Sequence, residues 1–183
     1  MRRIKENENV KPSFRTRRLT LLAMLLCCAV VIGYIEGSIP LNFTVPGVKL
    51  GLANVVVLFA LYKLKPGEVL ALVILKTFFT SVFAASFTAF AYSLCGSLIS
   101  FSAMLVMVKT GKGFFSPVGV SVIGAISHNV GQILVASFFV GSFLVITYLP
   151  VLLVSGAVTG FITGLTVSLL LKNITLSKMF EEK

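Results

Sequence analysis

The sequence predicts an all-α integral membrane protein, a six-transmembrane-helix bundle with its N- and C-termini in the cytoplasm. Its mean hydropathy is +1.02, 57% of its residues are hydrophobic and 12% are charged, about half the charge of a soluble domain. Several apolar runs reach or approach the roughly 20 residues that cross a bilayer. The 183 residues are therefore expected to form one membrane domain, without room for a soluble catalytic domain beside it.

Six apolar segments are separated by charged or turn-forming residues. The first follows a basic tail, the second ends at a Lys-Pro-Gly turn, and the fourth ends before a short basic connection. No charge marks the limit between the third and the fourth segments. The predicted organisation is a basic cytoplasmic tail at 1–18, a membrane domain at 19–172 with spans at 19–35, 48–64, 68–90, 92–108, 118–139 and 149–171, and a cytoplasmic tail at 173–183.

The distribution of Lys and Arg predicts the orientation of these spans. With the N-terminus inside, every basic connection falls on the cytoplasmic side, as the positive-inside rule requires. The two remaining outer connections, near residue 91 and at 141–148, carry no charge. The basic residues next to the spans are Arg17, Arg18, Lys63, Lys65, Lys109, Lys112, Lys172 and Lys178.

The stretch between the first two spans, EGSIPLNFTVPGVKLGLAN at residues 36–54, concentrates polar side chains. Its two prolines prevent a continuous helix. We predict a non-cytoplasmic loop that folds over the mouth of the bundle, with its polar groups facing an internal cavity; an ordinary turn with interfacial charges is the alternative. The candidate substrate-binding residues here are Glu36, Asn42, Lys49 and Asn54.

Lys76 lies within the third predicted span, about 13 Å from its start at 1.5 Å per residue. An ammonium group at that depth costs several kcal/mol, so it should face the bundle interior and find an anion. Glu36 and a bound ligand are both candidates for that anion. A purely structural ion pair and a lysine that snorkels to the interface are the other interpretations.

The fifth predicted span contains a second polar cluster, His128, Asn129 and Gln132. His128 and Gln132 are four residues apart and share a helix face, whereas Asn129 either borders the same cavity or bonds a neighbouring helix. A metal site is not expected, because one His without a Cys cluster cannot supply a coordination shell. Together with Lys49 and Lys76, His128 favours a ligand with negative charge or strong hydrogen-bond acceptors.

The sixth predicted span carries glycines at every fourth position, namely Gly156, Gly160 and Gly164. Such a stripe lets another helix approach to backbone contact. We therefore predict plain helix packing along it.

Several enzyme classes are disfavoured. The chain lacks a GxxxxGK[ST] loop for ATP hydrolysis, and its six acidic residues are all Glu, so a Ser–His–Asp constellation would need Glu as a substitute. Glu36 and Glu68 are expected at opposite membrane faces, where they cannot jointly hold magnesium on a diphosphate. No catalytic residue, metal or cofactor is predicted, and the protein is not expected to be an enzyme.

The segments PGVKLGLANVV at 46–56 and SHNVGQ at 127–132, with the stretch 36–40, resemble the Gx transporter family, also labelled heptaprenyl diphosphate synthase component I. That family in turn resembles the substrate-binding S components of energy-coupling factor (ECF) transporters, which are six-helix bundles that capture vitamins and similar solutes. The resemblance implies an ATPase pair and a transmembrane coupling subunit as partners. S components often dock through AxxxA on their first helix, and the nearest match here is Ala23-x-x-x-Cys27.

Three functions are compatible with these features. The first is an ECF S component that imports a small solute, with anions among the candidates. The second is a non-catalytic membrane component of heptaprenyl diphosphate or quinone biosynthesis, which would need a separate catalytic subunit because the chain lacks the DDxxD motif of prenyl diphosphate synthases. The third is a proton-coupled carrier that uses Glu36 or His128. Each implies a multi-pass protein of the bacterial cell membrane that contacts lipid and not nucleic acid.

Overall fold

The computed structural model describes residues 14–38, 52–83, 85–111 and 114–173, which form six α-helices, one 3-10 helix and, within these ranges, no strand. The prediction of an all-helical protein is confirmed. Five helical stretches of the described chain are long and apolar enough to cross a membrane, and α2 is shorter. The elements are α1 (Phe14–Ser38), α2 (Asn54–Lys63), α3 (Pro66–Phe83), α4 (Phe87–Thr110), α5 (Pro117–Val140), the 3-10 helix η1 (Phe143–Tyr148) and α6 (Leu149–Asn173).

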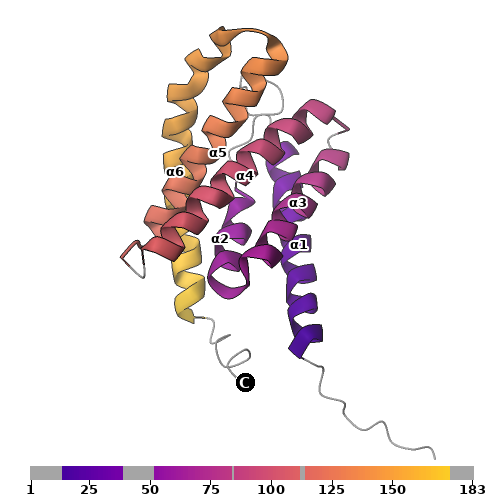
Figure 1. Cartoon of the computed structure of the whole chain (residues 1–183), viewed down its shortest axis with the longest axis vertical. Helices are drawn as coiled ribbons and strands as arrows, with labels where there is room; N and C mark the ends of the chain where they lie inside the picture. Colours follow the sequence, from indigo (N-terminus) through magenta and orange to yellow (C-terminus); the bar gives the residue numbers. More distant parts are fainter. Residues whose placement is uncertain (1–13, 39–51, 84, 112–113, 174–183) are drawn as a thin grey trace, which may run out of the picture.

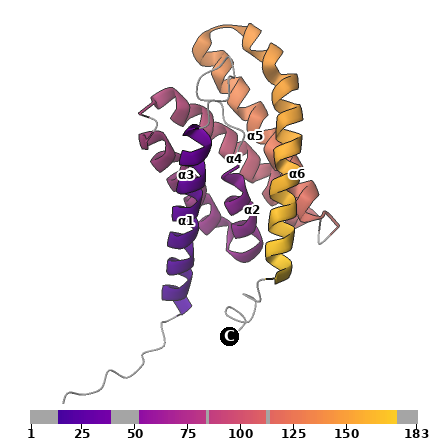
Figure 2. The same ribbon diagram turned by 180° about the vertical axis from the view of Figure 1, so that it is seen from behind.

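The short helix α2 forms the centre of the bundle. It contacts each of the other α-helices, and it lies between α1 and α6 in both views of the ribbon (Figures 1 and 2). Most of its side chains are buried, among them Val57, Leu58 and Ala60. An apolar helix that is buried on all sides is typical of the core of a bundle.

Helices α5 and α6 form a long antiparallel pair joined by η1 (Figure 1). A Cβ atom added to Gly160 would lie 2.8 Å from Val122 Cα, and one added to Gly164 would lie 2.6 Å from Val118 Cα. These distances are too short for real side chains, so the helices meet backbone to backbone. The packing predicted for the glycine stripe is confirmed.

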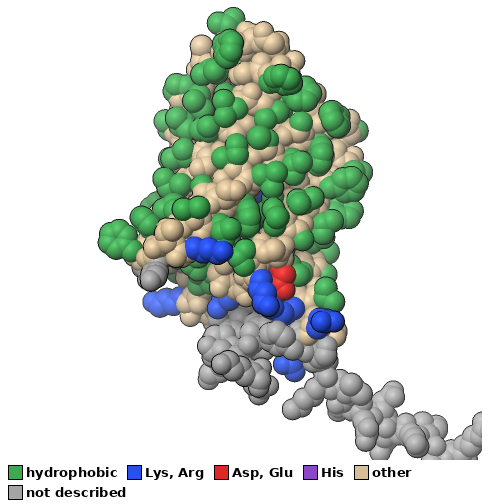
Figure 3. All heavy atoms as spheres, in the orientation of Figure 1, with side chains coloured by type: hydrophobic (Ala, Val, Ile, Leu, Met, Phe, Trp, Pro, Cys, Tyr) green, Lys and Arg blue, Asp and Glu red, His purple; other side chains and the backbone are tan. Residues whose placement is uncertain are grey.

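The face seen in Figure 3 is apolar except at one end. Hydrophobic side chains cover most of the visible face in Figure 3, and Lys and Arg side chains gather at its lower end. The start of α1, the α2–α3 turn and the ends of α4 and α6 all lie at this end (Figures 1 and 2). The described basic residues that the positive-inside rule assigned to one side therefore share one end of the bundle, whereas Lys112 and Lys178 lie outside the described residues.

The predicted limit between the third and fourth spans is wrong. We expected the third span to reach residue 90, but α3 ends at Phe83 and α4 begins at Phe87. Ser86 caps α4, because its hydroxyl accepts a hydrogen bond from the N–H of Ala89 at 3.2 Å, and Ala85 adopts a positive φ of 46°. A serine N-cap can set a helix start without any charge or proline nearby.

The helices around the polar stretch also differ from the prediction. Glu36, expected in a loop, lies in the last turns of α1. The second helix, expected from residue 48, begins only at Asn54, which is therefore its first residue and not an interior one. Asparagine favours helix ends because its side chain competes with the helical hydrogen bonds.

Candidate functional site

A buried ammonium–amide pair lies halfway through the bundle. Lys76 lies ten residues after the start of α3, and Asn54 lies nine residues before the end of α2. Both are therefore about 15 Å from the α2–α3 turn at 1.5 Å per residue. This depth is about half of a 30 Å hydrocarbon core. The Nζ atom of Lys76 donates a hydrogen bond of 2.8 Å to Oδ1 of Asn54.

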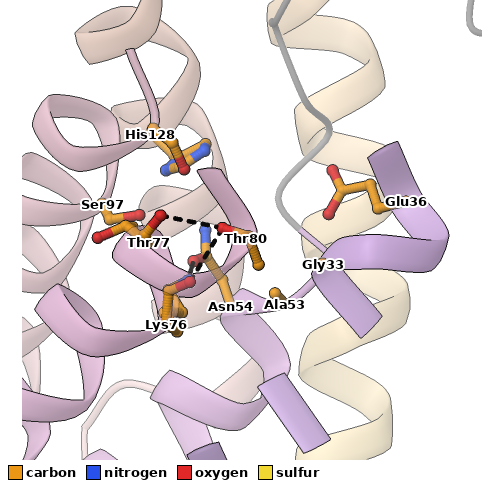
Figure 4. Close-up of a pocket in the computed structure, with 10 residues that line it drawn as sticks. Gly33, Glu36, Ala53, Asn54, Lys76, Thr77, Thr80, Ser97 and His128 are labelled. Atoms are coloured by element: carbon orange, nitrogen blue, oxygen red, sulfur yellow. Dashed lines mark hydrogen bonds between the residues drawn. The ribbon is translucent and has the colours of Figure 1, made fainter. Parts of the chain in front are cut away.

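The chemistry of this bond fixes the orientation of the Asn54 amide. An ammonium group can only donate, so the amide must turn its oxygen to Lys76 and its NH₂ group the other way. In Figure 4 that nitrogen is directed toward His128. Within the described part of the chain, Nδ2 of Asn54 has no hydrogen-bond partner. A buried donor without a partner lowers the stability of the fold by about 1–3 kcal/mol. Such a donor is unusual in a side chain that serves only packing.

The pair borders a small cavity of about 20 Å³, which has room for one water molecule. Five helical segments contribute to its wall (Figure 4). The lining residues are Gly33 and Glu36 of α1, Ala53 and Asn54 at the start of α2, Lys76, Thr77 and Thr80 of α3, Ser93 and Ser97 of α4, and His128 of α5.

The residues that line the cavity are buried, and most of them are polar. The exposed fractions are 4% for Glu36, 4% for Lys76, 2% for His128, 8% for Asn54 and 2% for Ser97. Figure 4 shows Glu36 approaching from α1, with Thr80 between it and Lys76 in this view. The structure therefore brings together four of the predicted site residues, and their hydrophilic side chains converge on one space.

Glu36 reaches the cavity because α1 packs closely on α3. A Cβ atom added to Gly33 would lie 2.6 Å from Cγ2 of Thr80 and 3.8 Å from Cβ of Ala53. Glu36 follows Gly33 by three residues and so shares its helix face. A side chain at position 33 would push this face of α1 away from the cavity.

The threonines of α3 and the serines of α4 differ in what they can offer a ligand. The hydroxyls of Thr77 and Thr80 donate to carbonyl groups of α3, so toward the cavity they can only accept. The Oγ atom of Ser97 is buried and has no partner among the described residues. Asn54 and Ser97 can therefore offer donors to a ligand, beside the charge of Lys76.

Close packing of α4 on α5 brings His128 to the cavity. A Cβ atom added to Gly96 would lie 2.7 Å from the carbonyl oxygen of His128, 2.9 Å from Cγ of Gln132 and 3.1 Å from Nδ1 of His128. His128 and Gln132 therefore share the α5 face that meets α4, as their spacing predicted. Gln132 is fully buried at this contact and does not line the cavity.

Asn129 points to a different neighbour. Its Nδ2 atom donates to the backbone carbonyl of Leu152 on α6, and Gly156 of α6 leaves space for the amide. Of the two roles considered for Asn129, the structure favours the bond to a neighbouring helix. Asn129 does not line the cavity.

The remaining predicted residues lie elsewhere. Asn42 and Lys49 fall outside the described residues. Ala23 and Cys27 are both exposed on the same face of α1, away from the core. Among the described residues, no group of three or more His, Cys, Asp or Glu side chains could hold a metal ion.

Sequence reasoning missed the hydroxyl side chains of the cavity wall. Thr80 lies four residues after Lys76 and three after Thr77, and Ser93 and Ser97 are four residues apart in a mostly apolar helix. Polar side chains that repeat on one face of a membrane helix indicate an interior face. This pattern could have identified them, but only the contact between α3 and α4 places them on one cavity.

Comparison with known families gives one match. The family model described as heptaprenyl diphosphate synthase component I matches residues 25–170. No curated protein and no solved structure gave a match. The matched region runs from α1 to α6 and covers most of the 183 residues, so the chain belongs to the heptaprenyl diphosphate synthase component I family.

Proposed function

We propose that this protein is the membrane-embedded substrate-binding component of an ECF-type transporter, and that it imports a small solute with a negative charge or strong hydrogen-bond acceptors. One observation carries the proposal. In the hydrogen-bonded Lys76–Asn54 pair, the NH₂ group of Asn54 is directed into a buried polar cavity at half the depth of the bundle. Side chains of this kind are costly in a membrane and are retained mainly where they bind or conduct something.

The short helix α2 strengthens the case for an anionic group. Ten residues span about 15 Å, so α2 begins near the membrane centre, beside the cavity. The N-terminus of a helix carries partial positive charge and unpaired N–H groups, both of which favour anions. Helices that begin within the membrane commonly direct their N-termini at anionic substrate groups in transporters. Lys76 and the Asn54 amide add a full charge and a donor at this point.

The small size of the cavity restricts what it receives. A volume of about 20 Å³ accepts one oxygen-sized group and not a whole vitamin-sized solute. We therefore propose that the cavity takes the charged or acceptor end of the solute. The remainder would lie toward the outer side, where the candidates Asn42 and Lys49 are expected.

The proposal includes six membrane spans, with both termini in the cytoplasm of a bacterial cell. It is supported by the gathering of basic side chains at one end of the bundle and by the uncharged connection at η1 on the other. In this topology the N-terminus of α2, beside the cavity, would point to the outer side, from which an external solute arrives. No catalytic role or cofactor is part of the proposal.

The partners would be a transmembrane coupling subunit and an ATPase pair, docking on the α1 face that carries Ala23 and Cys27. Small exposed residues on a membrane helix allow close approach of another helix. The test is affinity capture of the tagged full chain with its candidate partners co-expressed. Ala23→Leu/Cys27→Leu should abolish capture, and Ala71→Leu, a matched change on the exposed face of α3, should not. Capture that is unaffected by the double change would exclude this docking face.

The solute is tested separately. Native mass spectrometry of the gently purified protein should detect a bound small molecule carrying a carboxylate, phosphate or similar acceptor group. Lys76→Met should lose it, whereas Lys109→Met, at an exposed position on α4, should retain it. Equal retention by both variants would remove Lys76 from the site.

A second function is favoured by the family match alone. The family's name describes component I of a heptaprenyl diphosphate synthase, which would make the chain a non-catalytic membrane subunit of a prenyl diphosphate or quinone pathway. The chain has no aspartate and hence no aspartate-rich diphosphate site. Capture distinguishes the two functions, because a soluble synthase would support this one and an ATPase pair the first. Absence of any partner would instead favour a proton-coupled carrier.

A further inference from the structure

A second site lies at the basic end of the bundle, far from the solute cavity. A groove of about 470 Å³ opens between the first turns of α1 and the α2–α3 turn. Its volume falls within the roughly 300–1,000 Å³ range of small-molecule sites. Its lining residues are Arg15, Arg18, Leu19 and Leu22 of α1, with Lys65 and Glu68 from the other side.

The carboxylate of Glu68, which lines this groove, already has partners within the protein. One carboxylate oxygen of Glu68 lies 3.4 Å from Nη1 of Arg18, and the other accepts a hydrogen bond of 2.8 Å from the backbone N–H of Lys65. Both oxygens of Glu68 are therefore engaged, one of them at the start of α3, where negative charge is favourable. This arrangement also ties α1 to the beginning of α3 across the floor of the groove.

Two cations are left without an anion. Arg15 and Lys65 are exposed, and the part of the chain that the structure describes provides neither with an ion-pair partner. Three cationic side chains against one carboxylate give the groove a net charge of +2. The groove therefore has charge complementarity to an anionic group.

The groove changes from charged to apolar along α1. Arg15, Arg18, Leu19 and Leu22 share one helix face, and the step from Arg15 to Leu22 covers about 10 Å along the helix axis. Leu19 is largely exposed although it lines the groove. This order of cations followed by leucines matches the passage from lipid headgroups to acyl chains.

We infer that this groove binds the phosphate of an anionic phospholipid, with Arg15 and Lys65 on the headgroup and Leu19 and Leu22 against the start of the acyl chain. A free phosphate or other soluble anion would use the cations but not the leucines. A zwitterionic lipid would use the leucines but would gain little from the net charge. The site does not depend on the solute cavity or on its ligand.

The test counts lipids on the purified full chain by native mass spectrometry while dioleoyl phosphatidylglycerol or phosphatidylcholine is titrated into detergent micelles. Arg15→Gln/Lys65→Gln should weaken phosphatidylglycerol binding about 30-fold, and each single change about fivefold, since a cation near a membrane surface contributes about a factor of five. Phosphatidylcholine binding should change less than about twofold.

The matched control is Lys109→Gln/Lys172→Gln, which removes two exposed cations from the same end of the bundle but not from the groove. It should change phosphatidylglycerol binding less than about twofold. Equal losses in both double variants would overturn the inference, because the effect would then be general surface charge. Tight phosphatidylcholine binding, or displacement of phosphatidylglycerol by millimolar glycerol 3-phosphate, would overturn it as well. If the groove double variant does not fold, the two single variants decide.

Discussion

Replacing Asn54 with leucine isolates the bond that holds the buried ammonium of Lys76. The change leaves the charge in place and removes the oxygen that accepts its 2.8 Å hydrogen bond. Hydrogen bonds to charged groups contribute about 1.5–3 kcal/mol, and breaking a buried charged pair from one side costs more than the average. We expect Asn54→Leu to lower the free energy of unfolding by about 2–3 kcal/mol.

Lys76→Met acts on the same pair from the other side. It removes an ammonium whose location at half depth costs about 2.5–3.5 kcal/mol on insertion scales, and it strands the Asn54 carbonyl at a cost of about 1–3 kcal/mol. These terms nearly offset each other, so Lys76→Met should be less destabilising than Asn54→Leu. The double variant should be more stable than Asn54→Leu alone, with a coupling of about 2 kcal/mol between the sites.

The free energies are measured by reversible unfolding in mixed micelles with increasing dodecyl sulfate, on ligand-free protein. Lys109→Met serves as the control for loss of a lysine at an exposed position and should stay within about 0.5 kcal/mol of the unmodified protein. A coupling below about 0.5 kcal/mol would refute the reasoning, because the Asn54 amide would then not stabilise the buried charge of Lys76. Wild-type stability of Asn54→Leu would refute it equally.

Three further predictions concern packing, the site and the topology. Gly160→Ala should destabilise the protein by about 1–3 kcal/mol, because its methyl group would meet the backbone of α5. Gly67→Ala has open space around it and should stabilise the protein by about 0.5 kcal/mol. Similar unfolding free energies for the two variants would contradict this prediction. Ser97→Ala should leave the free energy of unfolding within about 0.5 kcal/mol of the unmodified protein. It should weaken binding of the co-purifying ligand about fivefold in a titration, which corresponds to the loss of one net hydrogen bond. Unchanged affinity would exclude Ser97 from ligand recognition. In a chain without its native cysteines, Phe143→Cys should react with impermeant maleimide added to intact cells and Lys172→Cys should not; the reverse pattern would invert the proposed orientation.

The family resemblance and the all-helical membrane class could be predicted because they depend on local features. The motif segments at 46–56 and 127–132 indicated the family that the family match then confirmed over residues 25–170. The relation to ECF transporters stays a prediction. The uncharged limit between α3 and α4 was misplaced because a serine N-cap, and not hydropathy, sets the start of α4.

The candidate site could be predicted only in part. Glu36, Asn54, Lys76 and His128 stood out because polar side chains in apolar segments are costly wherever they point. Their partners did not stand out: the bond between Lys76 and Asn54 joins residues 22 positions apart, and Asn129 turned out to bond α6. A lysine's need for a partner is visible in sequence, but the identity of the partner is not.

The sequence by itself determined that the chain is apolar enough for a membrane, where its basic residues gather and which side chains are too polar for lipid. These properties depend on residues that are neighbours in the sequence, so they can be recognised without knowledge of the fold. Only the tertiary structure decided that α2 begins at half depth, that Gly33 and Gly96 let α1 and α5 reach the cavity, and that Asn54 presents its NH₂ group there. Such features depend on which helices touch, and contact between distant segments is fixed by packing and not by composition.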